Sequence, residues 1–213
     1  MSLAVLTGDI VNSTKMPATE YQLVINRLQR LIVQADEHFS ASGQIFRGDA
    51  FQLHYTDIAQ ALKSTLLIKL GLYITEQVPS PVQCTLSLAY GQGLVKNESP
   101  NTSSGPVYTT SGRELENTTS GDLSVHISHC DAQNELILLT QFLNHLLNRL
   151  TKTQAELLYQ YVMSDFAEHK KLAELTGTTR QNISNRLANI GATLVENYCQ
   201  LINQYVATIK GNI

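Results

Sequence analysis

The sequence predicts an α+β protein in which a ferredoxin-like βαββαβ domain is followed by an all-α segment. Two observations lead to this expectation. β-like and helical patterns alternate through the first 130 residues, whereas from Thr151 onward the chain shows one helical pattern after another. The charge balance also changes: residues 1–144 carry 8 Lys/Arg and 13 Asp/Glu, and residues 145–213 carry 7 and 5.

We therefore expect a sheet domain at 1–130, a connecting helix at 131–150 and a helical domain at 151–213. The net charge of the whole chain, −3, is too small to indicate a partner. Only the last segment has an excess of positive charge, which suits a polyanionic partner. Three cysteines far apart in the chain are expected to be free thiols in a reducing compartment: Cys84, Cys130 and Cys199. No apolar run approaches the ~18 residues of a membrane span, so we expect a cytoplasmic protein with no membrane partner.

The first half of the sheet domain shows three patterns in order. Residues 3–10 are expected to form a short buried strand, because an apolar run leads into Gly8. From Pro17 to about residue 41, apolar residues recur at helical spacing, and proline suits the first turn of a helix. The segment 42–55, "SGQIFRGDAFQLHY", contains two β-like runs around a turn, which predicts a hairpin.

The second half continues the alternation. We expect a helix at 57–77 that "VPSP" ends, a strand within 82–95, a polar loop at 96–106, a helix at 107–118 and a strand at 123–128. This is the split βαβ order with an extension. A sheet of this kind is expected to carry its helices on one face.

Two carboxylates stand out in this domain. Asp9 and Asp49 each follow a glycine, one at the end of the first strand and the other in the hairpin turn. The first strand runs beside the hairpin, so the two can meet at one edge and hold Mg²⁺ or Mn²⁺. Ser13, Thr14 and nearby backbone N–H groups offer a place for a phosphate. The alternative is that Asp9 is a helix-capping or turn residue and that Asp49 is an ordinary aspartate of the hairpin turn.

"GDIVNST" and "FRGDAFQL" resemble the core of class III nucleotidyl cyclases, and with "SGPVYTTSGRELE" they resemble SatD-family proteins more closely, over about residues 3–128. The resemblance implies a cyclase-like fold and metal ligation by Asp9, the Ile10 carbonyl and Asp49. It also implies that Arg113 contacts a phosphate. From the residues alone, Arg113 is equally an exposed helical arginine paired with Glu116.

Three positions depart from the cyclase pattern. Thr109 stands where cyclases have an asparagine, Ile45 where a lysine contacts the base, and Ala50 where the motif has an acid. We therefore assign no catalytic residue and expect a domain that senses a nucleotide or a metal. The alternative is a metal-dependent enzyme that acts on a nucleoside triphosphate.

Residues 169–190 have the pattern of a helix-turn-helix. Gly177 ends a short helix, and Thr178 or Thr179 caps the next one. Small and apolar residues are expected to pack the pair: Leu172, Ala173, Leu175, Ile183, Leu187 and Ile190. Polar residues remain outside to contact DNA: Thr179, Arg180, Gln181, Ser184, Asn185 and, at a phosphate, Arg186.

"GTTRQNISNRL" resembles the helix-turn-helix of sigma-factor region four, and "LTKTQAELLYQYV" resembles the helix before it. The resemblance implies a DNA-binding transcriptional regulator with duplex DNA as its partner. The apolar helices at 134–147 and 194–209 suggest a homodimer that engages two half-sites. The alternative is a helical hairpin used for packing or dimerisation.

Overall fold

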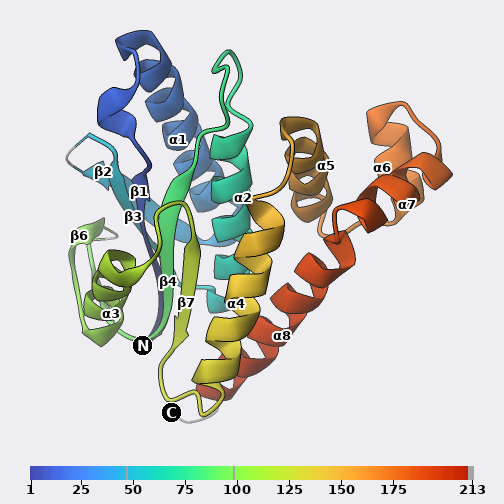
Figure 1. The fold of residues 1–213 in the computed structure, drawn as a ribbon. Helices are drawn as coiled ribbons and strands as arrows, with labels where there is room; N and C mark the ends of the chain where they lie inside the picture. Colours follow the sequence, from blue (N-terminus) through green and yellow to red (C-terminus); the bar gives the residue numbers. More distant parts are fainter. Residues whose placement is uncertain (47, 98, 211–213) are drawn as a thin grey trace.

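The computed structural model describes residues 1–46, 48–97 and 99–210, and it contains a five-stranded sheet in the order β2-β3-β1-β4-β7 (Figure 1). β1 is antiparallel to both of its neighbours, β3 and β4, and β7 is parallel to β4. The strands of this sheet are β1 (Ser2–Ile10), β2 (Ala41–Phe46), β3 (Ala50–Tyr55), β4 (Cys84–Gln92) and β7 (Leu123–Ile127). The α+β class and the βαββαβ order are as the sequence predicts.

Helices cover both faces of this sheet, so the expectation of helices on one face only is wrong. α1 (Ala18–Phe39) and α2 (Ala61–Tyr73) contribute to the large apolar cluster that contains Ala4 and Leu6 of β1. α3 (Pro106–Asn117) packs on the opposite face, where its Val107 joins a cluster with the alternate residues Leu3 and Val5 (Figure 1). Successive residues of a strand point to opposite faces, and both sets in β1 are apolar, so both faces require a cover.

Residues 96–106 are not the predicted polar loop. They contribute to a second, two-stranded sheet of β5 (Leu94–Lys96) and β6 (Ser99–Ser104). The Thr102 hydroxyl donates to the Lys96 carbonyl (2.6 Å), and the Ser103 hydroxyl accepts from the Lys96 N–H (3.0 Å). Hydroxyl-to-backbone bonds stabilise this hairpin in place of an apolar face, which is why its strands show no alternation. The predicted helix at 57–77 is also shorter: it starts as a 3₁₀ turn, η2 (Ile58–Gln60), and α2 ends at Tyr73.

The outer edge of β7 is covered by two amide side chains of α4 (Gln133–Leu147). Asn144 accepts from the Leu123 N–H (2.9 Å) and donates to the Leu123 carbonyl (2.8 Å). Gln133 accepts from the Ile127 N–H and donates to the Val125 carbonyl, both at 3.1 Å. These amides replace the next strand, so β7 ends the sheet without leaving these backbone groups unpaired.

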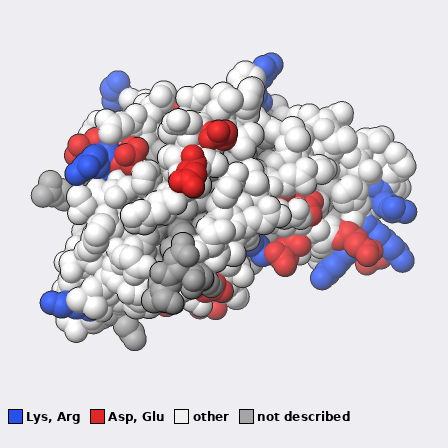
Figure 2. Space-filling view, turned by 90° about the horizontal axis from the view of Figure 1, so that it is seen from below, with Lys and Arg blue, Asp and Glu red and all other residues white. Residues whose placement is uncertain are grey.

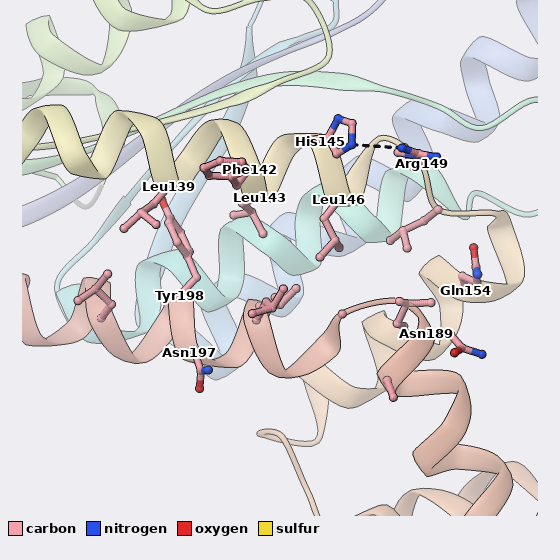
Figure 3. Close-up of a pocket in the computed structure, with 17 residues that line it drawn as sticks. Leu139, Phe142, Leu143, His145, Leu146, Arg149, Gln154, Asn189, Asn197 and Tyr198 are labelled. Carbon is pink, nitrogen blue, oxygen red and sulfur yellow. Dashed lines mark hydrogen bonds between the residues drawn. The ribbon is translucent and has the colours of Figure 1, made fainter.

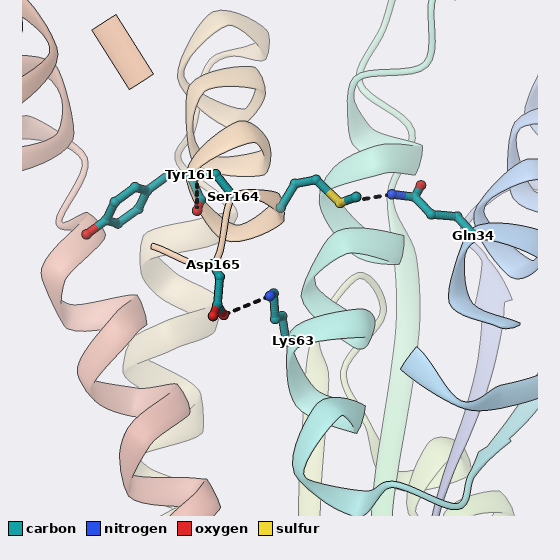
Figure 4. A network of polar contacts seen from close by, with 6 residues as sticks. Gln34, Lys63, Tyr161, Ser164 and Asp165 are labelled. Atoms are coloured by element: carbon teal, nitrogen blue, oxygen red, sulfur yellow. Dashed lines mark hydrogen bonds and ion pairs between the residues drawn. The ribbon is translucent and has the colours of Figure 1, made fainter. Parts of the chain in front are cut away.

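The remaining helices extend the same apolar cluster, and the first and last of them contact α2. They are α5 (Lys152–Met163), α6 (His169–Thr176), α7 (Arg180–Asn189) and α8 (Ala192–Lys210). Figure 4 shows two polar contacts between the end of α5 and the helices α1 and α2. Lys63 of α2 forms an ion pair with Asp165 (2.8 Å), and the Gln34 amide of α1 donates to the Met163 sulfur (3.0 Å). No helix in the described part of the chain has the length and apolar character needed to cross a membrane.

We expect Asn144→Ala to lower the free energy of unfolding by about 1–3 kcal/mol, because the buried Leu123 N–H and carbonyl would lose their partner. Chemical denaturation measures the change. Asn148→Ala is the matched control: Asn148 is exposed, and among the described residues it bonds to the Asp122 side chain (2.7 Å) and to the Asn144 and Leu146 carbonyls of the helix end, so its loss should be within about 0.5 kcal/mol. Equal losses in the two variants would contradict the role given to Asn144.

Candidate metal and nucleotide site

Asp9 and Asp49 lie at neighbouring points of one sheet edge because of the register of β1. Gly8 pairs with Phe51 of β3, and Asp9 is the next residue of β1. Asp49 occupies the hairpin turn directly before Ala50, where β3 begins. Both side chains are partly exposed, and their charges interact. The structure thus brings together the two carboxylates that the sequence singled out.

The two glycines before these acids serve different purposes. A Cβ atom on Gly8 would lie 2.4 Å from the Phe51 ring and 2.7 Å from the Leu86 side chain, so β1 admits no side chain there. Gly48 has φ +90°, a conformation that other residues rarely adopt, and it forms the turn that presents Asp49. The repeated Gly-Asp pair therefore follows from close packing at one position and from a turn at the other.

Ser13 fixes the position of Asp49. It lies in η1 (Ser13–Lys15), a 3₁₀ turn that follows Asn12, whose φ of 57° reverses the chain after β1. The Ser13 side chain is buried and its hydroxyl donates to an Asp49 carboxylate oxygen. Thr14, the other expected phosphate contact, is exposed. The loop that follows β1 is thereby tied to the hairpin turn on which Asp49 lies.

The surroundings of Asp9 disfavour its negative charge. Burial raises the pKa of the Asp9 carboxyl above its ordinary value of 3.8, and the negative charge of Asp49 raises it further. A hydrogen bond with the Ile10 backbone opposes this rise in the pKa of Asp9. A bound divalent cation would reverse the balance, since its charge favours both carboxylates in their ionised form.

The donor set fits a magnesium-type cation. In the part of the chain that the structure describes, no third His, Cys, Asp or Glu joins Asp9 and Asp49 to form a larger cluster. Mg²⁺ is commonly held by one or two carboxylates together with waters and substrate phosphates, so two carboxylates suffice for it. Ile10, the last residue of β1, has a buried side chain in the core, and only its carbonyl is a candidate ligand.

A buried lysine holds the strand beside Asp9 in place. Lys69 of α2 donates to the Gly121 carbonyl (2.5 Å) and to the Cys84 carbonyl (3.3 Å). Burial lowers the pKa of Lys69, while the nearby Cys84 and Asp122 oppose this change. Cys84 pairs with Ile10 in the sheet, so Lys69 anchors the start of β4 next to the acidic pair.

Arg113 is not joined to the acidic pair within this chain. Its side chain is exposed on α3, and among the described residues it forms no ion pair with Asp9, Asp49 or Glu116. The alternative of an Arg113–Glu116 pair is therefore not observed. Ile45 packs against the apolar core, so this side chain does not contact a ligand on the polar face of the sheet.

A strip of polar side chains crosses the sheet on the α3 side, and sequence reasoning missed it. The Gln52 amide donates to the Thr7 hydroxyl (3.0 Å), which lies 2.7 Å from the Ser111 hydroxyl. On β2, the Gln44 carbonyl oxygen accepts from Ser99 (3.3 Å), and the buried Gln44 N–H₂ has no partner among the described residues. Thr7 and Asp9 share a strand face, so the strip leads toward the acidic pair. The sequence signal that could have indicated this strip is the pair of alternate polar residues, Thr7 and Asp9, in a strand that is otherwise apolar.

No protein-family model matches this chain, and no curated protein matches it. Solved structures do. They include the monomeric guanylyl cyclase domain of the RhoGC fusion protein from the aquatic fungus Blastocladiella emersonii (14% identity, 64% of this chain and 85% of that chain, TM-score 0.49). The guanylate cyclase domain of RhGC from Catenaria anguillulae, in complex with GTP, matches with 16% identity over 64% of this chain and 81% of that chain (TM-score 0.46). The adenylate/guanylate cyclase/hydrolase from Silicibacter pomeroyi matches with 16% identity over 71% and 82% (TM-score 0.45). Because these TM-scores are below 0.5, the function of this chain is inferred below from its own residues.

α6 and α7 form a tight helical pair. Gly177 ends α6 with φ +64°, and the Thr179 hydroxyl caps α7 by accepting from the Asn182 N–H (3.2 Å). Five of the six residues expected to pack the pair are buried: Leu172, Ala173, Ile183, Leu187 and Ile190. The expectation for Leu175 is wrong, because its side chain is 68% exposed. Glu174, the residue before it, is also exposed, so this part of α6 faces solvent.

The residues expected to contact DNA lie mostly on the surface of α7. Thr179, Arg180, Gln181 and Asn185 are exposed, whereas Ser184 and Arg186 are half-buried. The Gln181 amide donates to Asn185 (3.0 Å). Figure 2 shows Lys and Arg side chains at the end of the molecule that α6 and α7 form, next to acidic side chains. The surface there carries both positive and negative charges. It is marked by hydrogen-bonding side chains such as Gln181 and Asn185, and not by a basic patch.

We expect Asp9→Asn to raise the thermal midpoint of the metal-free protein at neutral pH and to abolish its increase by Mn²⁺. The raised pKa of Asp9 means that the folded chain binds this proton more tightly than the unfolded chain. Stability from this group is therefore greatest at acid pH and falls as the pH rises from 3.8 through the raised value. At Mn²⁺ about 100 times its Kd, the native protein should gain about 2.7 kcal/mol, or several degrees. Asp36→Asn, an exposed change on α1, is the control. A Mn²⁺ shift that persists in Asp9→Asn would exclude Asp9 as a ligand.

Proposed function

We propose that this chain binds a nucleoside triphosphate together with Mg²⁺ or Mn²⁺ at the edge formed by β1 and the β2–β3 hairpin. Asp9, Asp49 and the carbonyl of Ile10 are the proposed metal ligands. The observation that carries the proposal is the meeting of two partly exposed carboxylates, one of which Ser13 holds in place. Two like charges close together disfavour each other, and a divalent cation removes this repulsion.

The triphosphate is the natural further ligand of such a cation. Mg²⁺ held by two carboxylates retains open positions that phosphate oxygens fill. Ser13 is already engaged with Asp49, so its role is to position that carboxylate. Thr14 and Arg113 are exposed and are the proposed phosphate contacts. The polar strip that includes Gln44 and Gln52 offers hydrogen-bonding groups on the same face of the sheet.

We further propose that turnover of the bound nucleotide is slow. The proposed metal ligands are present, which favours phosphoryl chemistry. The side chains that should orient the base and stabilise the developing charge are absent: Ile45 packs in the core, and Thr109 is an exposed residue of α3. The same site would serve a cyclase-like enzyme of low activity or a nucleotide sensor, and the two functions differ only in the rate at which the bound nucleotide is turned over.

We expect ATP or GTP to bind only when Mn²⁺ is present, and Asp49→Ala to remove this binding. Titration calorimetry measures binding, and chromatography of the products measures turnover, for which we expect a rate below roughly 1 s⁻¹, the lower end for ordinary enzymes. Asp36→Ala is the control, since Asp36 is an exposed acid of α1 remote from the hairpin turn. Nucleotide binding that is unchanged in Asp49→Ala would contradict the proposed site. Cyclic product formed at ordinary enzymatic rates would contradict the slow turnover.

A second function is supported by α7: binding of duplex DNA by a regulator that uses the first site as a sensor. The capped start of α7 presents Arg180 and Gln181 to solvent, while Ile183 anchors the helix in the core. Side chains of these types at the start of an exposed helix suit the major groove.

We expect a DNA sequence to be enriched by selection from a random pool, and Arg180→Ala to weaken binding to it by about 1–3 kcal/mol. Arg186→Ala should weaken binding to all sequences alike and reduce its salt dependence, as expected for a phosphate contact. Arg30→Ala, an exposed arginine of α1, is the matched control for the loss of charge. If no sequence is enriched and genomic DNA is not bound at low salt, α6 and α7 serve packing alone.

A further inference from the structure

The outer face of α4 is apolar and exposed. The exposed fractions are 53% for Leu138, 38% for Leu139 and 65% for Phe142. This face borders a groove of about 870 Å³ between α4 and α8, and on the α8 side Leu194 is 65% exposed (Figure 3). Large apolar side chains gathered in this way on a surface mark a site of association.

Charged residues stand at both ends of this face. Glu135 and Phe142 are seven residues apart on α4, so they lie along one line of the helix, and Arg149 lies seven residues further, in the turn that directly follows α4. Glu135 and Arg149 are exposed, and in the described part of the chain neither forms an ion pair. The Arg149 guanidinium lies 3.2 Å from the ring nitrogen Nε2 of His145, which is in the last turn of α4. The face thus has an acid at one end, a base at the other and a phenylalanine midway.

This face is complementary to itself when two copies run antiparallel. With the two-fold axis at Phe142, each residue faces the one equally far on the other side of Phe142. Glu135 then faces Arg149 of the second copy at both ends, and the apolar residues between them meet in the same way. The apolar pairs are Phe142 with Phe142 and Leu138 with Leu146, and Leu139 meets the imidazole of His145. A parallel arrangement would instead place Glu135 against Glu135 and Arg149 against Arg149.

We propose that the chain forms a homodimer in which α4 packs antiparallel against α4 of a second copy. A two-fold interface requires that one surface complement itself, and the placement of Glu135, Phe142 and Arg149 meets this requirement. The groove beside Phe142 provides room for the ring of the second copy. The inference makes the expected homodimer specific in helix, direction and axis, and it does not depend on the nucleotide site.

Sedimentation of the full chain tests the charged contacts. Glu135→Arg and Arg149→Glu should each weaken dimerisation roughly tenfold or more, since every dimer contains the contact twice and repulsion replaces attraction. The double variant should restore dimerisation. Phe142→Glu should abolish it, whereas Leu175→Glu, a change at an equally exposed leucine of α6, should not. A wild-type chain that is monomeric at all concentrations, or a double variant that fails to recover although its helical content is unchanged, would overturn the proposal.

Disulfide formation tests the direction of packing. In a Cys130→Ser background the remaining cysteines, Cys84 and Cys199, are buried. Phe142→Cys should then give a linked dimer rapidly under mild oxidation, because residue 142 faces itself across the axis. Leu138→Cys should not, because its two copies would be about 12 Å apart along the helices at 1.5 Å per residue. Equally fast linkage at both positions would show parallel helices and overturn the antiparallel arrangement. If the wild-type chain is monomeric and binds an added amphipathic peptide, the groove is a binding site for a helix of another protein, and the homodimer proposal is wrong.

Discussion

The register of β1 is the constraint on which the rest of the structure depends. β1 lies at the centre of the sheet, and both of its faces are buried against helices. A shift of one residue would turn Thr7 and Asp9 toward α1 and α2 and would bring Leu6 to the polar side. Core packing thus decides that Asp9 emerges at the end of β1 nearest the hairpin turn. The Gly48 turn and the hydrogen bond from Ser13 then place Asp49 beside it, and the packing of the core offsets the electrostatic repulsion between the two carboxylates.

The parts of the fold that could be predicted are those in which apolar residues form a run or recur at regular spacing. The strands of the five-stranded sheet, α1, α3 and the Gly177 turn follow from spacing and capping that are local in the sequence. The β5–β6 hairpin could not be predicted, because its hydroxyl-to-backbone bonds have no periodic signature. The position of α3 on the second face depends on a cluster between Leu3, Val5 and Val107, which lie about a hundred residues apart. The hydrogen bond from Gln52 to Thr7 could not be predicted either, because these residues are also far apart in the sequence. The Gly-Asp motifs of the acidic pair could be recognised because each is short and local.

α2 is packed on both sides, and this explains its composition. The sheet lies on one side of it and α5 on the other, so nearly every residue from Ala61 to Leu72 is buried. A helix that is apolar all round has no periodic face, and the one buried cation in it, Lys69, satisfies its charge with backbone carbonyls at the start of β4 and before β7. The start of β4 beside the acidic pair and two of the C-terminal helices, α5 and α8, therefore both contact α2. A ligand at the acidic edge and a partner at α6 and α7 would act on one continuous core.

The amide side chains that cover β7 have a consequence for synthesis of the chain. Gln133 and Asn144 come from α4, which is made after β7, and Gln133 lies six residues beyond Ile127. Until α4 docks, β7 presents free N–H and carbonyl groups to the strands of other chains. Chains that stall or are cleaved between 127 and 147 would retain that open edge. The finished protein is protected from strand-to-strand aggregation at this edge, and its risk is concentrated in a brief stage of its production on the ribosome.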